Sequence, residues 1–594
     1  SYKQLQFLLA YLKCAGNVSG KYPFVMKKDI YKEISPDRSI INALLKKNVI
    51  TIEKRKVDRL ERGNSVQNVE ELQLTDAQQK VYHDIKTGFV DKNIVLLHGV
   101  TSSGKTEVYI KLIQDTLIEK RQVLILLPDI AITTQIVMRI TAYFGKKVGV
   151  YHSKFNHNEK VEVWNSVLDN NEVAETGYNI IIGTRSSIFL PFNNLGLIII
   201  DDEHDYSYKQ SDVSPRYNTR DCAVYMAGVY KAKVLLCSAT PSIETYFNTK
   251  NGRYGLVTLN ERYGGLQLPE INVVDMKDEH RKKSLVLGNY SVGLIDEIRR
   301  TLAEKRQVLI FQNRRGFALR LECDLCGWVP TCPNCDVALI YHKSFNQMRC
   351  HYCGFYTPVY SDCPKCKGNS LSMKGYGTEK VEEELQSLFP EAIIRRMDLD
   401  TTRRKNAFTE ILSEFSMGKI DILVGTQMVI KGLNFENISL VGVINTDSLL
   451  YFPDFRAFER AFQDIVQVSG RAGRKKDRGK VILQTYSPYH SAIVYALDND
   501  YQKMYQSQIL DRQTHKYPPV YRLISVKIKH KDYEVVNSAS AAFAMLLRQE
   551  LGNRVLGPEY ASIPRINDMY IKNILIKIER SKVFQQIKDR FISC

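Results

Sequence analysis

The sequence predicts a multidomain α/β protein built around two parallel β-sheets, and three observations lead to this fold class. Short apolar runs rich in β-forming residues alternate with helical segments from residue 72 to 263, and a second series of the same kind runs from 292 to 490. This alternation is typical of parallel sheets joined by crossover helices. Eight cysteines interrupt the second series between Cys323 and Cys366. A chain of 594 residues is also too long for one hydrophobic core.

The segments around the two sheets differ in character. The N-terminal residues read as helices followed by a β pattern, which is typical of a winged helix; a small packing domain without DNA contact is the alternative, because fold alone does not fix function. The C-terminal residues start helical and end in β-like runs, which predicts an α+β domain. The expected boundaries are 1–62 for the winged helix, 63–71 for a linker, 72–263 for the first sheet, 264–291 for a connection, 292–320 and 371–490 for the two parts of the second sheet, 321–370 for the cysteine-rich insertion and 491–594 for the C-terminal domain.

The charge of the chain favours a polyanionic partner. Lysine and arginine number 83 against 65 acidic residues, a net charge of +18, so nucleic acid is the first candidate and a merely soluble basic protein is the alternative. No apolar run approaches the roughly 18 to 20 residues that span a bilayer, and the N-terminus lacks the apolar region of a signal peptide. We therefore expect a cytoplasmic protein that does not contact a membrane. Because the chain opens with Ser1 in place of Met, we also expect a fragment of a longer protein.

The first sheet carries a phosphate-binding signature. The apolar run "IVLLHG" leads directly into a G-x-x-x-x-G-K-T loop that should open a helix, formed by Gly99, Val100, Thr101, Ser102, Ser103, Gly104, Lys105 and Thr106. In such a P-loop the backbone N–H groups and the helix N-terminus surround the phosphates of a nucleotide. Lys105 would reach the β and γ phosphates of ATP, and Thr106 would be a ligand of Mg²⁺.

A second acidic signature follows about a hundred residues later. The apolar run "LGLIII" ends in Asp201, Asp202, Glu203 and His204, which places carboxylates at the carboxyl edge of the sheet. This is a Walker B element, in which Asp201 would hold Mg²⁺ and the next acid would polarise the water that attacks the γ phosphate. An acidic helix cap is the alternative reading of the same residues.

The residues after this element combine aromatic and basic side chains. In "DYSYKQSDVSPRYNTRD", Tyr206, Tyr208 and Tyr217 alternate with Lys209, Arg216 and Arg220. Such a mixture suits stacking on bases and contact with phosphates, so we expect a DNA-contacting loop. The alternative is that the tyrosines pack the loop against the sheet.

The eight clustered cysteines form four C-x-x-C pairs, which predicts two tetrahedral zinc sites of four thiolates each. Only five residues separate the first and second pairs, too few for an easy hairpin, whereas fourteen separate the second and third, a usual ribbon spacing. We therefore predict nested sites. A purely structural role for the zinc is favoured because four thiolates fill its coordination shell, and DNA or protein contact through the neighbouring aromatic and basic side chains is the alternative. The inner site would be Cys332, Cys335, Cys350 and Cys353, and the outer site would be Cys323, Cys326, Cys363 and Cys366.

The order of these elements resembles that of superfamily-2 helicases, and the double cysteine cluster makes the chain similar to the primosomal protein N-prime family of bacterial replication restart helicases. The matching elements are Gln78 in "LTDAQQ", the P-loop, "LLPDIAIT", "GTRSSIF", "DDEH", "CSATP", "VGTQMVIKGLNF" and "QVSGRAGR". The resemblance implies two RecA-like helicase lobes, with the double zinc ribbon inserted in lobe 2. It also implies that Gln78 reads adenine, that "SAT" couples hydrolysis to motion, and that Gln467, Arg471 and Arg474 act across the cleft. From the resemblance we also expect that the family's N-terminal domain, which captures the nascent 3′ end, is missing from this fragment.

One residue departs from the family pattern, which is usually D-E-x-H, because Asp202 stands where the glutamate is expected. Its side chain is one methylene shorter. Either the backbone compensates, or Glu203 takes part, or hydrolysis is slow.

The resemblance implies an ATP-dependent 3′-to-5′ DNA helicase that recognises stalled or abandoned forks, unwinds the lagging-strand arm and initiates primosome assembly. The expected cofactors are ATP, Mg²⁺ and two Zn²⁺ ions. The expected partners of this monomer are branched and single-stranded DNA and, by resemblance, the single-stranded DNA-binding protein and the helicase-loader proteins of the primosome. Two alternatives remain open: a general repair or branch-migration translocase, and a DNA-binding loading scaffold whose ATPase is dispensable.

Overall fold

The computed structural model describes most of the chain in two compact units, residues 1–62 and 63–594. Its described residues are 2–15, 25, 30–31, 33–34, 38–52, 72–128, 134–153, 155–168, 177–211, 213–265, 268–287, 289–312, 320–335, 337–342, 346–350, 353–374, 377–398, 401–402, 407–430, 437–473 and 478–580.

The first unit is a small helical core. Helices α1 (Tyr2–Ala15) and α3 (Arg38–Lys46) pack through Phe7, Ile41 and Leu44, which are all buried. Most of the β pattern expected after these helices, and the whole linker 63–71, lie outside the described residues. The winged-helix expectation therefore stays a prediction.

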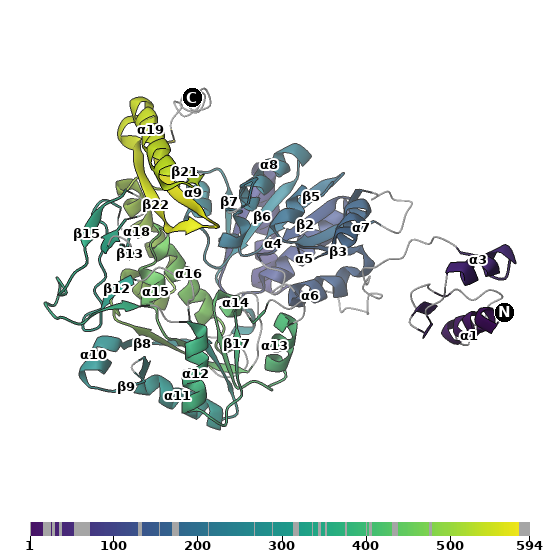
Figure 1. Cartoon of the computed structure of the whole chain (residues 1–594), viewed down its shortest axis with the longest axis horizontal. Coiled ribbons are helices and arrows are strands. Elements are labelled where there is room, and N and C mark those ends of the chain that lie inside the picture. Colours follow the sequence, from purple (N-terminus) through teal and green to yellow (C-terminus); the bar gives the residue numbers. More distant parts are fainter. Residues whose placement is uncertain are drawn as a thin grey trace. The chain divides into compact units, whose positions relative to one another are not determined.

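Lobe 1 is a seven-stranded sheet in the order β3-β4-β2-β5-β6-β1-β7, and every neighbouring pair in it is parallel (Figure 1). Its strands read as nearly continuous apolar runs because both faces are covered. The elements are α4 (Asp76–Asp91), β1 (Ile94–Gly99), α5 (Lys105–Ile118), β2 (Gln122–Leu126), α6 (Thr134–Phe144), β3 (Val148–Tyr151), α7 (His157–Leu168), β4 (Ile180–Gly183), β5 (Leu195–Ile200), α8 (Thr219–Tyr230), β6 (Lys233–Ser238), α9 (Ile243–Lys250) and β7 (Gly255–Leu259).

Lobe 2 is a six-stranded parallel sheet in the order β17-β18-β11-β19-β20-β8. Two parallel-sheet lobes are the predicted fold class, and the structure confirms them. The elements are β8 (Glu270–Asp275), α10 (Met276–Arg281), β9 (Leu285–Val286), β10 (Tyr290–Ser291), α11 (Val292–Ala303), β11 (Gln307–Phe311), α12 (Thr378–Leu388), β17 (Ile394–Met397), α13 (Ala407–Ser416), β18 (Ile422–Gly425), α14 (Gln427–Ile430), β19 (Ile438–Val443), α15 (Asp447–Leu450), α16 (Ala457–Ser469) and β20 (Lys480–Thr485).

One strand of lobe 2 comes from an unexpected part of the chain. Residues 264–291 were expected to be only a connection, yet β8 within them pairs in parallel with β20 along its whole length and forms an edge of the second sheet. Its side chains are half-buried or exposed, so the segment lacks the apolar run that marks the other strands.

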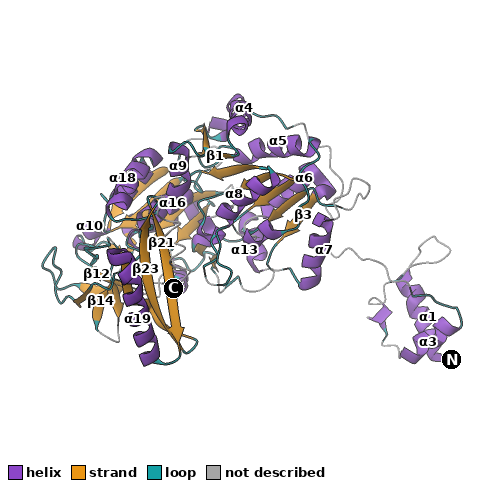
Figure 2. Ribbon diagram, turned by 90° about the horizontal axis from the view of Figure 1, so that it is seen from above, coloured by secondary structure: helices purple, strands orange, loops and turns teal. Residues whose placement is uncertain are grey.

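The cysteine-rich insertion and the C-terminal region are small antiparallel structures. The insertion contains β12 (Arg320–Cys323) paired with β16 (Leu371–Lys374), and a three-stranded sheet of β13 (Ile340–His342), β14 (Gln347–Arg349) and β15 (Tyr356–Pro358). After α17 (Ser491–Leu497) and α18 (Tyr501–Thr514), strands β21 (Tyr521–His530), β22 (Val555–Ile566) and β23 (Met569–Glu579) form a sheet along which α19 (Tyr533–Leu551) lies (Figure 2). Among the described residues, no helix is both long and apolar enough to cross a membrane.

Candidate functional site

The P-loop follows β1 and turns directly into α5. Gly104 occupies the position before the helix with φ 78°, a left-handed conformation that glycine adopts without strain. A Cβ atom on Gly104 would lie 2.2 Å from Nε2 of Gln78. Glycine is therefore required here both by the backbone and by the close approach of Gln78.

Gln78 is locked over the loop by its own helix. It is buried at the start of α4, where it forms a capping box with Thr75. Its Nε2 donates to the carbonyl oxygens of Gly104 at 3.2 Å and of Ser103 at 3.4 Å. The expected nucleotide-reading glutamine and the P-loop are thus one rigid assembly.

The side chains of the loop present donors to its centre. The ammonium of Lys105 donates to the carbonyl oxygens of Gly99 at 2.8 Å and Val100 at 3.1 Å. The hydroxyl groups of Ser102 and Ser103 are buried and have no hydrogen-bond partner among the residues that the structure describes. A bound polyphosphate would supply acceptors for all three groups.

The carboxylates of the Walker B element meet the P-loop at the carboxyl edge of the sheet. Asp201 follows β5, and burial raises its pKa to about 7; the neighbouring Asp202 carboxylate adds to the rise, and the Lys105 ammonium opposes it. Asp202 itself takes a left-handed φ of 46°, which places its side chain differently from those of regular strand residues. Asp201 and the hydroxyl of Thr106 have the oxygen chemistry that Mg²⁺ prefers.

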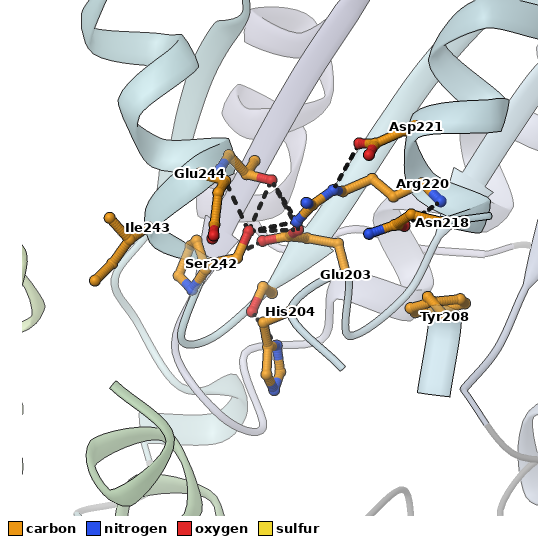
Figure 3. A network of polar contacts seen from close by, with 12 residues as sticks. Glu203, His204, Tyr208, Asn218, Arg220, Asp221, Ser242, Ile243 and Glu244 are labelled. Atoms are coloured by element: carbon orange, nitrogen blue, oxygen red, sulfur yellow. Dashed lines mark hydrogen bonds and ion pairs between the residues drawn. The ribbon is translucent and has the colours of Figure 1, made fainter. Parts of the chain in front are cut away.

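Glu203 is fully engaged in a polar network (Figure 3). Its Oε1 accepts a hydrogen bond from the backbone N–H of Ser242 at 2.7 Å, and its Oε2 accepts from Arg220 Nη1 at 2.9 Å and Thr245 Oγ1 at 2.8 Å. The side chain is buried. Glu203 therefore ties the Walker B turn to the start of α9, and Asp202 is the better candidate for the general base.

Lobe 2 reaches this site through α16. Both ring nitrogens of His204 have a partner: His204 Nδ1 lies 2.8 Å from Ser238 Oγ, and His204 Nε2 lies 2.5 Å from Gln467 Nε2. Burial lowers the pKa of Arg471 to about 10, and the carboxylate of Asp202 opposes the shift. Gln467 and Arg471 thus lie near the Walker B residues, and their catalytic role stays a prediction. Arg474 lies outside the described residues.

The six residues expected in a DNA-contacting loop separate into different environments. Tyr206 is 45% exposed, and the Arg460 guanidinium of α16 lies 4.9 Å from its ring centre. Lys209 and Arg216 are also exposed. Tyr217 is half-buried and packs edge-on against Phe189 at 4.9 Å.

Tyr208 and Arg220 do not match the expectation. Tyr208 is 1% exposed, and its hydroxyl lies within hydrogen-bonding distance of the carbonyl oxygens of Leu126, 2.9 Å, and Asp201, 2.6 Å. For this residue the packing alternative is correct, because a buried ring cannot stack on a base. The Arg220 guanidinium is bound to Glu203 and Ser242, so it is not presented to a nucleic acid.

The eight cysteines gather into two groups of four, in the nested sets that their spacing predicts: Cys323, Cys326, Cys363 and Cys366, and Cys332, Cys335, Cys350 and Cys353. The sulfur atoms of each group lie within 4.8 Å of one another. Four thiolates at this separation are a structural zinc site. The inner group is part of a small core with Leu321, Val337 and Met348.

Comparison with known proteins agrees with this geometry. Models of four families match the chain: DEAD/DEAH box helicase at residues 75–248, helicase conserved C-terminal domain at 375–476, the PriA DNA helicase Cys-rich region at 332–358 and the primosomal protein N C-terminal domain at 513–591. Replication restart protein PriA of Borreliella burgdorferi is 36% identical over 523 residues, which cover 87% of this chain and 77% of that protein.

This chain belongs to the replication restart protein PriA family. The PriA proteins of Bacillus subtilis and Synechocystis are 40% and 39% identical, over 86% and 92% of this chain. The chain spans 63% and 66% of the lengths of those two relatives.

Sequence reasoning missed several residues that the structure brings to the site. Glu459 and Gln463 lie on α16 two turns and one turn before Gln467, and Arg512 lies on α18. Their spacing of eight and four residues from Gln467, which places all three on one helix face, is a signal that could have found them. Arg512 carries no motif, so only the fold reveals it.

Proposed function

We propose that this chain is an ATP-dependent DNA helicase of the DExH type that acts in replication restart. Membership of the PriA family supports the proposal, and so does the arrangement of the site. The single observation that carries it is the meeting of four groups from two lobes, Lys105 beside Asp201 and Arg471 beside Asp202. This is the arrangement that in-line transfer of a γ phosphate to water requires.

Each group has a role in the proposed reaction. The P-loop backbone, Lys105 and the serine hydroxyls bind the phosphates, and Gln78 holds the adenine side. Thr106 and Asp201 would hold Mg²⁺, which supplies positive charge at the β and γ phosphates. Asp202 accepts the proton of the attacking water, and Arg471 neutralises charge that develops on the γ phosphate. Gln467 and Arg474 are assigned to the lobe 2 side by the same motif.

The finer activity follows from the family. We propose 3′-to-5′ movement on single-stranded DNA, recognition of stalled forks, unwinding of the lagging-strand arm and initiation of primosome assembly with single-stranded DNA-binding protein and loader proteins. The exposed Tyr206, Lys209 and Arg216 are the part of the loop after Walker B that would contact DNA. A cytoplasmic location and a monomeric state stay predictions.

Hydrolysis with different DNA ligands tests the proposal. The rate of ATP hydrolysis should be low without DNA, higher with single strands and highest with a model fork, and little raised by blunt duplex. A general translocase would respond equally to forks and to other branched DNA. A loading scaffold would bind forks tightly without DNA-stimulated hydrolysis, and that result would overturn the helicase assignment.

Direction is tested on two partial duplexes that differ only in the polarity of the single-stranded arm. The proposal expects unwinding of the substrate with a 3′ loading strand. Unwinding of only the substrate with a 5′ strand would contradict the proposed polarity while leaving the ATPase assignment intact.

A further inference from the structure

Helix α16 presents a row of three buried side chains to lobe 1. Glu459, Gln463 and Gln467 are four residues apart and therefore share one face of the helix. Gln467 contacts His204, Gln463 Nε2 donates to the carbonyl of Thr240 at 3.1 Å, and Glu459 Oε1 accepts from the backbone N–H of Ile243 at 2.9 Å. The row thus contacts the Walker B turn and the segment Ser238–Ile243 that follows β6.

A second helix, α18, approaches the same segment from beyond the helicase domains. Arg512 is 1% exposed, and its Nη2 lies 2.5 Å from Glu459 Oε2 while its Nη1 lies 3.5 Å from Glu244 Oε1. The hydroxyl of Tyr501 donates to the carbonyl of Pro241 at 2.8 Å. Arg512 is in the interval between the residues matched by the helicase C-terminal model and by the C-terminal domain model.

These groups form a cluster of charges. Arg456 Nη2 lies 2.7 Å from Glu244 Oε1, so two arginines face two glutamates; Arg512 and Glu459 are buried, and Arg456 and Glu244 are partly exposed. Burial by itself would raise the pKa of Glu244, but Arg456 and Arg512 lower it well below its usual value. Removing one member leaves a partner charge buried and uncompensated, which is the costly way to break a buried pair.

We propose that Glu459 and Arg512 are positioning residues of the ATP site, which hold the Ser238–Ile243 segment of lobe 1 against α16 and so link hydrolysis to the helix that leads into the C-terminal region. The inference rests on the proposed ATPase function. Among the described contacts, neither residue touches the P-loop, so both act through other groups.

The path to the reacting groups is short. Ser238 Oγ accepts from the N–H of Thr240 at 3.0 Å and is 2.8 Å from His204 Nδ1, and His204 follows the Walker B acids directly. A shift of the segment would move Ser238 and with it His204. Because rates of enzymatic steps fall steeply when reacting groups are displaced, such a shift should lower turnover while nucleotide binding persists.

The test is steady-state ATP hydrolysis by the full chain with saturating single-stranded DNA, expressed per nucleotide-binding site. Arg512→Met should lower kcat by about tenfold and change KM for ATP by less than about twofold. The matched control is Arg554→Met, which removes an arginine from an ion pair with Glu579 at 2.8 Å on the C-terminal sheet. The control should keep the parental kcat.

A double-mutant cycle tests whether the two residues act together. Glu459→Gln keeps an acceptor for the Ile243 N–H but removes the charge that faces Arg512, and it should also lower kcat. The variant with both changes should be no slower than Arg512→Met alone. Losses that multiply would show independent roles and overturn the inference.

The outcomes separate this inference from the proposed function. A parent chain without hydrolysis would overturn the function itself. If the parent chain hydrolyses ATP and Arg512→Met has the same kcat, only the positioning role is overturned. The same holds if Arg512→Met has fewer nucleotide-binding sites but an unchanged kcat per site. If Arg512→Met does not fold, Arg512→Lys replaces it. Lysine keeps the positive charge but lacks the forked guanidinium group, so this variant should show a smaller loss of kcat. Parental kcat in both Arg512→Lys and Glu459→Gln would then overturn the inference.

Discussion

On the lobe 1 side of the candidate site, the functional groups come from the start of α4 and from three short stretches that follow β1, β5 and β6, whereas on the lobe 2 side they come from single residues of α16 and the turn after it. The lobe 1 groups are fixed by bonds within their own lobe, as in the contact of Gln78 with Gly104. Each α16 group is fixed by a partner in the other lobe, such as His204 for Gln467. In the proposed mechanism, lobe 1 therefore binds the nucleotide with its own groups, while completing the reacting site requires both lobes.

Among the lobe 1 residues, the largest effect is expected for Lys105. Lys105→Ala should lower ATP hydrolysis by at least about a hundredfold, because the ammonium is the only side-chain cation that the P-loop itself contains. DNA binding should stay near the parental value, since the residues proposed to contact DNA, Tyr206, Lys209 and Arg216, lie outside the P-loop. Lys111→Ala, on the same helix, is the control and should hydrolyse normally. Hydrolysis by Lys105→Ala near the parental rate would contradict the assignment of the P-loop as the phosphate-binding site.

The two neighbouring acids of the Walker B turn sharpen the comparison. Asp202→Asn should lower hydrolysis by about a hundredfold, and Asp202→Glu should keep or raise it, because the longer side chain restores reach. Glu203→Gln should lower hydrolysis only about tenfold but also lower the thermal unfolding temperature, since Glu203 holds Arg220 and α9. Single-turnover hydrolysis and thermal unfolding measure the two effects, and the reverse ranking would move the general base to Glu203.

His98 provides a pH test of the lobe 1 side. Burial lowers the pKa of His98 from 6.5 to about 4, against a hydrogen bond to the Ala239 carbonyl that raises it. The unfolded chain takes up the proton near pH 6.5 and the folded chain does so only near pH 4, so stability falls as pH falls between these values. At pH 5 the loss should be about 2 kcal/mol relative to pH 8.

The variant His98→Gln isolates this contribution, because glutamine keeps a donor for Ala239 without titrating. Denaturant unfolding at pH 8 and pH 5 should show a smaller loss of unfolding free energy in the variant than in the parent. Identical pH dependence in both proteins would mean that His98 has the same pKa in the folded and the unfolded chain, which would contradict the expected effect of burial.

The smallest effect on hydrolysis is expected for Tyr206, whose ring lies beside Arg460 of lobe 2. Tyr206→Ala should lower the stimulation of hydrolysis by single-stranded DNA about five- to tenfold, in line with the low end of the about 1–3 kcal/mol for one stacked base, while leaving basal hydrolysis unchanged. Tyr208→Phe is the matched variant, since it removes only the hydroxyl that faces Leu126 and Asp201. It should lower stability by about 1 kcal/mol and keep DNA stimulation. Equal stimulation in both variants and the parent would exclude base stacking by this loop.

Local spacing explains what could be predicted from sequence. The P-loop, the Walker B turn and the nested cysteine pairs are fixed by residues close to one another in the chain, and the structure brings each set together. The sequence could not distinguish the exposed Tyr206 from the buried Tyr208. An irregular loop has no regular alternation of buried and exposed positions, so a separation of two residues carries no information about burial. Strand β8 was missed because an edge strand need not be apolar.

Other parts of the site could not be predicted from the sequence because they depend on contacts between residues far apart in the chain. Glu459 binds the N–H of Ile243, which is 216 residues earlier, and Arg512 pairs with Glu244 and Glu459 from a helix without a motif. No local pattern specifies such partners. The same holds for Arg220, whose place beside Glu203 follows from the packing of α8 against the sheet.

We propose that lobe 1 binds the nucleotide and that lobe 2 then completes the reacting site. The variant Arg471→Ala tests this most directly. The measurement is single-turnover hydrolysis of ATP with saturating single-stranded DNA, beside the equilibrium dissociation constant of the nucleotide. The account predicts a hydrolysis rate lower by about a thousandfold with a dissociation constant within about threefold of the parent. A hydrolysis rate near that of the parent, or a loss explained entirely by weaker nucleotide binding, would contradict it.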